Sequence, residues 1–317
     1  MASINVGLRR GFFGGSGSGL FSKSACCAAV VQLTGKPASD VTVLYLGTAT
    51  YDIEQSKTTQ TARFAEQGCT VTELKCATSD PDPAQMEALC SAADIVIVSG
   101  GNTLYAYDRW KTIGLGDLLF KAWNAGTVLA GGSAGAIMWF DAGHSDSADP
   151  ATFKVAMLAE GKGGEAADDA APAEEEKKDW KYVRCPALGY YPGLLCPHHD
   201  KTQSNGTPRY RDFDEMLLRH PGERGICIDH WAALVVEGDD YSVWTLEGEQ
   251  GSVGEDGTFV EPGVQGQPGI FTKDVGADGI IKVTLAPTSG KVSDLLQKAT
   301  SSSEDPVVGV LRKTNPH

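Results

Sequence analysis

Up to about residue 140, the chain alternates short apolar runs with longer stretches of helical composition. The apolar runs have the length and residue types of buried strands, and they fall at 41–46, 70–74, 95–98 and 127–130. The helical stretches fall at 58–67, 83–92 and 118–124. Strands that alternate with helices of this size predict an α/β fold, with a mostly parallel sheet and helices on both of its faces.

Two local features refine this pattern. Asp82 stands directly before Pro83, which predicts a helix start because Asp caps helices and proline fits the first helical position. Near the N-terminus, we expect a first strand at 4–8, with the glycine- and serine-rich segment 14–19 as the turn after it.

The alternation breaks at 160–179, where acidic residues and alanines prevail and large apolar residues are nearly absent. Such a segment cannot bury enough apolar surface to offset its ordering entropy. We therefore expect a mobile acidic insertion on the surface of the domain.

Regular elements resume after the insertion. A helical pattern occupies 209–219, strands are expected at 225–229 and 232–236, and the sequence from about 241 to 317 is rich in strand and turn residues. We predict a single α/β domain over residues 1–317, with the insertion at 160–179 and a strand-rich C-terminal extension at about 241–317.

The charge balance restricts the partners. The chain has 41 acidic and 27 basic residues, which gives a formal net charge of −14 at pH 7. This excess repels phosphate backbones and anionic lipid surfaces, so we expect neither nucleic acid nor a membrane as a partner. No apolar run approaches the roughly 18 residues that span a bilayer. The sequence is compatible with a homodimer.

The eight cysteines indicate a reducing compartment. None belongs to a C-x-x-C pair, and several lie inside apolar runs such as 26–30 and 226–228. This placement is typical of buried thiols rather than of disulfides or a zinc site. We expect a cytoplasmic protein without a metal or any other cofactor.

The clearest chemical motif is GGSAG at 131–135, which follows the strand at 127–130 and opens a helix. This is the context of a G-x-S-x-G nucleophile elbow, whose small neighbours let the serine project its hydroxyl into a cleft. The following helix directs N–H groups toward a developing oxyanion. Ser133 is therefore the candidate nucleophile, although a tight or phosphate-holding turn would also use these glycines.

A second loop, GGNT at 100–103, follows the strand at 95–98. Loops at the carboxyl ends of neighbouring parallel strands face one crevice. Backbone N–H groups of this loop could therefore form an oxyanion hole together with the N–H of Ala134. The alternative is again a tight turn.

A serine nucleophile needs a base, and histidine is the usual one. His198 and His199 follow the apolar segment 194–197, which places them at a strand end, and they are the preferred pair. His144 lies just beyond the nucleophile helix. His230, beside Asp229, would be an orienting group or a loop residue.

Together, GGNT at 100–103, GSAGA at 132–136 and the pair Pro197-His198 resemble the peptidase E and cyanophycinase family of serine peptidases in order and spacing. The resemblance covers about residues 41–236. It implies a flavodoxin-like α/β fold akin to class I glutamine amidotransferases. The elbow residue of those amidotransferases is usually cysteine, so a serine at this position favours the peptidase branch.

The resemblance also implies roles for individual residues. Ser133 matches the nucleophile and His198 the base, while Gly101 and Ala134 match the oxyanion donors. The third member of the triad matches Asp229, in the turn between two late strands. Relatives also carry an acid in the loop after the nucleophile, which leaves Asp146 and Asp149 as alternatives.

For substrate, the resemblance implies a serine exopeptidase that removes N-terminal Asp from dipeptides, or a cyanophycinase-like enzyme that cleaves β-aspartyl peptides. Both must hold a carboxylate near the scissile bond, so a cation is expected there. Arg209 matches it, Arg211 is a second candidate, and Asn102 is expected to contact the peptide. A catalytically silent anion-binding protein is the remaining alternative.

Overall fold

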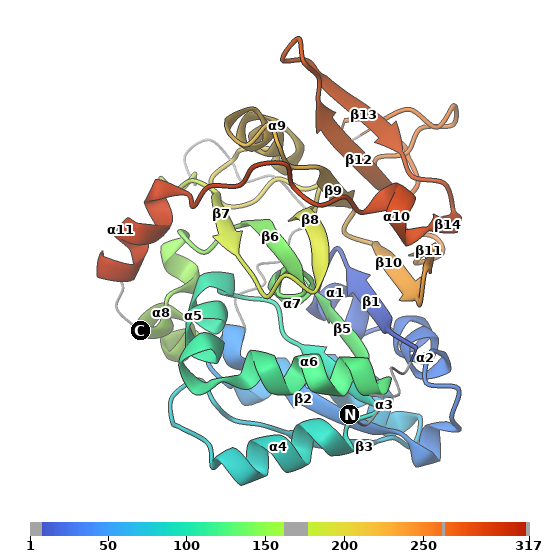
Figure 1. Ribbon diagram of the computed structural model, residues 1–317, viewed down its shortest axis with the longest axis vertical. Helices are drawn as coiled ribbons and strands as arrows, with labels where there is room; N and C mark the ends of the chain where they lie inside the picture. The colour runs from blue at the N-terminus through green and yellow to red at the C-terminus, as the bar shows by residue number, and fades with distance from the viewer. Residues whose placement is uncertain (1–7, 162–176, 262–263, 315–317) are drawn as a thin grey trace, which may run out of the picture.

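The chain folds into two sheets with helices packed around them (Figure 1). The computed structural model describes residues 8–161, 177–261 and 264–314. The larger sheet has the strand order β14-β11-β10-β1-β5-β4-β2-β3. Its strands are β1 (Arg10–Gly14), β2 (Thr42–Leu46), β3 (Thr70–Glu73), β4 (Ile95–Val98), β5 (Val128–Gly132), β10 (Ala232–Glu237), β11 (Asp240–Thr245) and β14 (Ser289–Lys291).

The five strands from β1 to β3 in this order are parallel, and β10, β11 and β14 extend the sheet beyond β1, each antiparallel to its neighbour on the β1 side. The first described strand is β1, at Arg10–Gly14. Of the strand expected at 4–8, all but Leu8 lies outside the described residues, and Leu8 belongs to no strand. The glycine- and serine-rich segment 14–19 does follow the first described strand directly.

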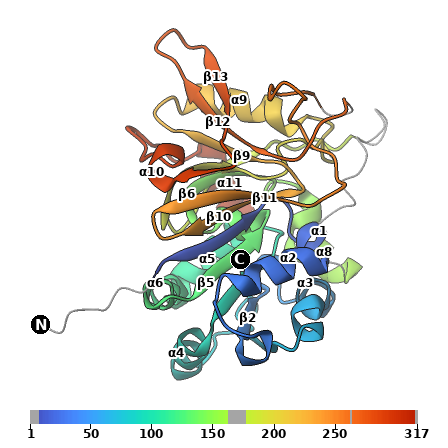
Figure 2. The ribbon, with the colours of Figure 1, turned by 90° about the vertical axis from the view of Figure 1, so that its right-hand side faces the viewer.

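Both faces of the larger sheet are covered by helices, as the alternation of strands and helices predicts. Val43 and Tyr45 of β2 pack into one apolar cluster, which includes residues of α2 and α3, while Leu44 and Leu46 pack into the other, which includes residues of α5 and α6. Successive strand side chains point to opposite faces, so each strand serves two cores. Figure 2 shows this layering edge-on.

The helices are α1 (Ser18–Phe21), α2 (Ser24–Gln32), α3 (Glu54–Glu66), α4 (Pro83–Ala92), α5 (Thr103–Ile113), α6 (Leu115–Ala125), α7 (Ala134–Ile137), α8 (Lys154–Glu160), α9 (Arg209–Arg219), α10 (Val292–Leu295) and α11 (Pro306–Thr314). The start predicted for α4 is confirmed, since the Asp82 side chain accepts a hydrogen bond from Gln85 N. Across the described ranges, no helix has the length and apolar character that a bilayer crossing requires.

The smaller sheet has the order β13-β12-β9-β8-β6-β7. Its strands are β6 (Phe140–Ser145), β7 (Val183–Pro186), β8 (Tyr191–Cys196), β9 (Gly225–Ile228), β12 (Ile270–Val275) and β13 (Ile281–Leu285). Only β6, β8 and β9 are parallel neighbours. The α/β class is confirmed, but the strands divide between two mixed sheets, which the sequence pattern alone does not predict.

The structure describes most of the C-terminal extension but only the ends of the acidic insertion at 160–179. Most of the predicted insertion, 162–176, lies outside the described residues. The C-terminal extension forms most of the late strands: β12 pairs with β9 in the smaller sheet, and β14 pairs with β11 in the larger one. The extension is therefore built into both sheets.

This pairing generates a test by truncation. A chain that ends at Leu246 would lose β12, β13 and β14 and leave β9 as an open edge, so we expect no cooperative thermal transition by circular dichroism. A chain that ends at Asp305 loses α11, with its one buried side chain, Val308, and keeps the buried Asp305 carboxylate that accepts from Arg184 N, so it should keep a cooperative transition at a somewhat lower Tm. A cooperative melt of the shorter chain within a few degrees of full length would contradict the integrated extension.

Candidate active site

Ser133 has the backbone of a nucleophile elbow. It lies between β5 and α7 with φ 54° and ψ −125°, and its N–H donates to Gly14 O at 3.2 Å. A positive φ is strained for a residue with a side chain and needs support from its surroundings. The neighbouring glycines provide the close packing, because a Cβ on Gly132 would lie 1.8 Å from Ser16 O and one on Gly135 2.1 Å from Val98 O.

The GGNT loop approaches this elbow in a conformation that requires glycine. Gly101 has φ +112°, and a Cβ there would lie 2.4 Å from Ala49 O. Among the described residues, neither the N–H of Gly101 nor that of Ala134 has a hydrogen-bond acceptor. Two such unengaged donors suit the predicted oxyanion hole.

Asn102 holds the loop together. Its Oδ1 accepts from Tyr105 N at 2.9 Å, which caps α5, and its Nδ2 donates to Thr152 Oγ1 at 3.0 Å. The side chain is buried. These contacts tie α5 to the segment at 150–152, and the substrate contact expected of Asn102 stays a prediction.

His198 lies at the end of β8, as the sequence predicts for a base, and it too has a positive φ, of 49°. Its N–H donates to Gly15 O at 3.1 Å, next to the Gly14 carbonyl that accepts from Ser133. Within the described ranges, no hydrogen bond joins Ser133 Oγ to the His198 ring. Such bonds are often long before substrate binds.

The His198 ring is buried and contacts a second histidine. Its Nδ1 lies 2.8 Å from His230 Nδ1. Burial lowers the pKa of His198 well below its ordinary value, and the neighbouring His230 ring and the charges of Arg209 and Lys201 lower it further. His198 is therefore neutral at neutral pH, as a general base must be.

Asp229 does not reach His198 in the structure. Its carboxylate accepts from Ser252 N at 2.8 Å, from Ser252 Oγ at 2.7 Å and from Gly269 N at 3.0 Å. Both oxygens are thus held by the C-terminal extension, which is why the predicted Asp229–His198 pair does not form. The histidine near Asp229 is His199, whose Nδ1 lies 3.7 Å from Oδ1.

The alternative acids and the alternative base are also engaged elsewhere. Asp149 caps Ala151 N and accepts from Ser204 Oγ, and Asp146 accepts from Gln203 Nε2 at 3.2 Å. His144 pairs with Asp212 at 2.8 Å, and burial lowers its pKa to about 4. Among the described residues, none of these three makes a hydrogen bond with His198.

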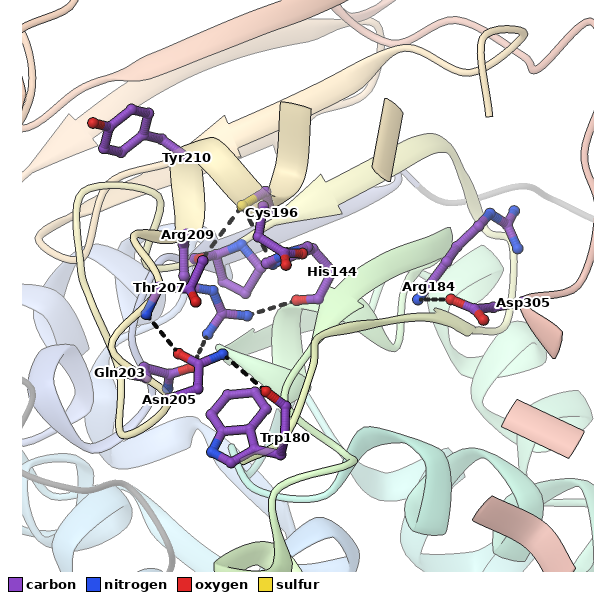
Figure 3. Close-up of polar contacts among 12 residues, drawn as sticks. His144, Trp180, Arg184, Cys196, Gln203, Asn205, Thr207, Arg209, Tyr210 and Asp305 are labelled. Atoms are coloured by element: carbon purple, nitrogen blue, oxygen red, sulfur yellow. Dashed lines mark hydrogen bonds and ion pairs between the residues drawn. The ribbon is translucent and has the colours of Figure 1, made fainter. Parts of the chain in front are cut away.

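Arg209 begins α9 and is buried. Its guanidinium donates to Gln203 Oε1 at 2.8 Å and to the His144 carbonyl at 2.6 Å (Figure 3). Its charge also lowers the pKa of His198. Arg211, the second candidate, is 60% exposed and pairs with Glu261.

Several residues of this region are not marked in the sequence by any motif. Ser252 and Gly269 lie in the glycine-rich extension, and only their contacts with Asp229 give them a role. Asp200 accepts from His230 N at 2.7 Å. In the sequence, its position directly after His198 and His199 is the one feature that points to a role in the site. In the described part of the chain, no three His, Cys, Asp or Glu side chains form a group that could hold a metal ion.

The contacts of Asp229 predict a stability effect. Asp229→Asn turns an acceptor pair into one acceptor and one donor that faces buried N–H groups, so the free energy of unfolding should fall by about 2 kcal/mol. Urea denaturation measures this loss. The control is Asp240→Asn: the Asp240 ion pair with Lys291 is exposed, so its loss should leave the denaturation midpoint nearly unchanged. An unchanged midpoint for Asp229→Asn would contradict the buttressing role.

Comparison with curated proteins identifies two relatives. The chain is 29% identical to a protein of Trypanosoma brucei brucei named G2/mitotic-specific cyclin-1, over 339 aligned residues that cover 100% of this chain and 96% of that protein. It is 32% identical to the uncharacterized peptidase YgaJ of Bacillus subtilis, over 120 residues that cover 38% of this chain and 39% of the relative. The cyclin name describes that protein alone.

Solved structures share the fold. A peptidase from an acI-B1 actinobacterium superimposes with a TM-score of 0.57 at 18% identity, over 90% of this chain and 98% of that one. A putative peptidase E protein from Listeria monocytogenes gives a TM-score of 0.51 at 17% identity, over 76% of this chain and all of the other. The peptidase E-type fold is thereby confirmed. Residues 14–244, most of the chain, match peptidase family S51, and the chain belongs to that family of serine peptidases.

Proposed function

We propose that the chain is an exopeptidase for small peptides, with Ser133 as nucleophile and His198 as general base. The observation that carries this proposal is the strained elbow of Ser133, anchored on Gly14 O, beside His198, anchored on Gly15 O. A positive φ is strained for a non-glycine residue, and here two such residues are held by hydrogen bonds to consecutive carbonyls. Backbone strain of this kind is typical of active sites.

In the first half-reaction, His198 Nε2 takes the Ser133 proton and Oγ attacks the scissile carbonyl carbon. The N–H groups of Gly101 and Ala134 bind the oxyanion of the tetrahedral intermediate. The protonated His198 then gives its proton to the leaving amine nitrogen, the C–N bond breaks, and an acyl-enzyme ester remains on Ser133.

In the second half-reaction, His198 takes a proton from water, and the hydroxide attacks the ester carbon. The same two N–H groups bind the new oxyanion. The bond between carbon and Ser133 Oγ breaks, His198 returns the proton to Oγ, and the acid product leaves.

For specificity, we propose a preference for dipeptides with N-terminal Asp. Arg209 is a buried cation whose charge lowers the pKa of His198, and it could hold a substrate carboxylate through charge-assisted hydrogen bonds. Cyanophycinase-like cleavage of β-aspartyl peptides needs the same cation and is the second candidate. A dipeptide panel separates the two.

Ser133→Ala should lower kcat by on the order of 10⁴–10⁶-fold, because it removes the nucleophile. Alanine fits the same turn, so Tm should not change. Dipeptide hydrolysis and labelling with a fluorophosphonate probe, mapped by mass spectrometry, measure the effect. Ser39→Ala, at an exposed site, is the control. Near-normal turnover of Ser133→Ala would refute the peptidase mechanism, and an inactive, unlabelled wild-type protein would favour the anion-binding alternative.

The Asp-over-Asn ratio of kcat/KM tests specificity. A buried charge pair left without its partner costs about 2–5 kcal/mol, so the wild-type ratio should be at least about 30. Arg209→Met should erase most of this preference and leave slow cleavage of neutral peptides. Arg211→Met, at the exposed neighbour, should keep it. A wild-type ratio near one would exclude the aspartyl preference.

A further inference from the structure

We propose that His230 is the positioning residue for the base, so that the working constellation is Ser133–His198–His230. In this arrangement the neutral imidazole of His230 accepts a hydrogen bond from His198 Nδ1–H. The inference rests on the proposed function and deepens it, because it assigns a group to the role for which Asp229 was expected.

The contact between the two rings, together with the role of His198 as the base, assigns the protons. The two Nδ1 atoms lie 2.8 Å apart, a hydrogen-bond distance, so one of them donates and the other accepts. If His230 donated, the proton of neutral His198 would sit on Nε2, which could not then accept the Ser133 proton. His198 is a base only when its own Nδ1 donates, which leaves the proton of His230 on Nε2.

The His230 ring is held in place from several sides. Its backbone N–H donates to Asp200 Oδ1 at 2.7 Å, and its carbonyl accepts from Ser16 Oγ at 2.9 Å. A Cβ on Gly19 would lie 2.8 Å from His230 Nε2, so the loop leaves just enough space for the imidazole. Trp231 packs against the ring at 4.4 Å between centroids.

The surrounding charges keep the pair neutral. Burial lowers the pKa of His230 to about 3, and Lys201 adds to the effect. His198 faces the positive charges of Arg209 and Lys201 besides His230 itself. The carboxyl groups behind the pair, Asp200 and Asp229, have pKa values raised by their own burial.

The low pKa of His198 determines how kcat/KM changes with pH. Catalysis requires unprotonated His198, and a group with a depressed pKa stays unprotonated as the pH falls below its ordinary value of about 6.5. The acid limb of kcat/KM should therefore lie below pH 6.5. A carboxylate at position 230 would stabilise the imidazolium, raise the pKa of His198 and move the limb to higher pH.

Two near-isosteric variants test the acceptor. His230→Asn keeps an acceptor oxygen near the place of Nδ1, whereas His230→Leu has almost the same shape without one. We expect His230→Leu to lose about 100-fold in kcat with little change in KM, and His230→Asn to stay within about tenfold of wild type. Equal losses in the two variants would overturn the role of His230.

The pH profile adds a measurement that a purely structural role would not move. His230→Asp should shift the acid limb of kcat/KM, and of fluorophosphonate labelling of Ser133, upward by about one pH unit or more. An unshifted limb would overturn the proposal.

The ¹⁵N shifts of the imidazoles supply a readout that does not depend on activity or on folding of the position-230 variants. In the Ser133→Ala protein they should show protonated Nδ1 on His198 and protonated Nε2 on His230, and the reverse assignment would overturn the proposal. If the wild-type protein neither hydrolyses peptides nor takes the label, the proposed function falls, and the positioning role of His230 with it. If it does both and only the tests at position 230 fail, the proposed function stands and this inference alone is refuted.

Discussion

The site depends on the close packing of three backbone segments against the glycine-rich loop at 14–19. This loop accepts from Ser133 N and His198 N at consecutive carbonyls, and a Cβ on Gly15 would lie 1.9 Å from Asp229 O. Side chains at these positions would push the nucleophile elbow, the base and the turn at 229–231 apart. The glycines therefore allow three segments that are distant in sequence to meet at one place.

The C-terminal extension stabilises the same turn from the other side. A buried carboxylate without donors costs several kcal/mol, and within the described ranges the hydrogen bonds to the Asp229 carboxylate come from Ser252 and Gly269. Both residues lie beyond the range 14–244 that matches the family. The shape of the turn that carries His230 is thus set partly by sequence outside that range.

The elements that depend on local sequence could be predicted, and those that depend on distant contacts could not. The helix at 209–219, the capped helix at 83–92 and the serine elbow follow from periodicity, capping and glycine spacing. The second sheet does not, because it joins β6, β8 and β9 to strands of the extension. The pairing of Asp229 failed for a similar reason: whether residue 229 or 230 faces the base is decided by contacts more than twenty residues away.

A neutral acceptor beside the base also suits the electrostatics of the proposed site. A carboxylate at position 230 would strengthen His198 as a base, but it would add a negative charge where the substrate's own carboxylate is expected to bind near Arg209. An imidazole fixes the tautomer of His198 without that repulsion, and burial raises the pKa values of the two acids behind it, Asp200 and Asp229. With Asp229 in a supporting role and His230 in an orienting one, the proposed site would place no carboxylate at position 230 to compete with an anionic peptide for Arg209.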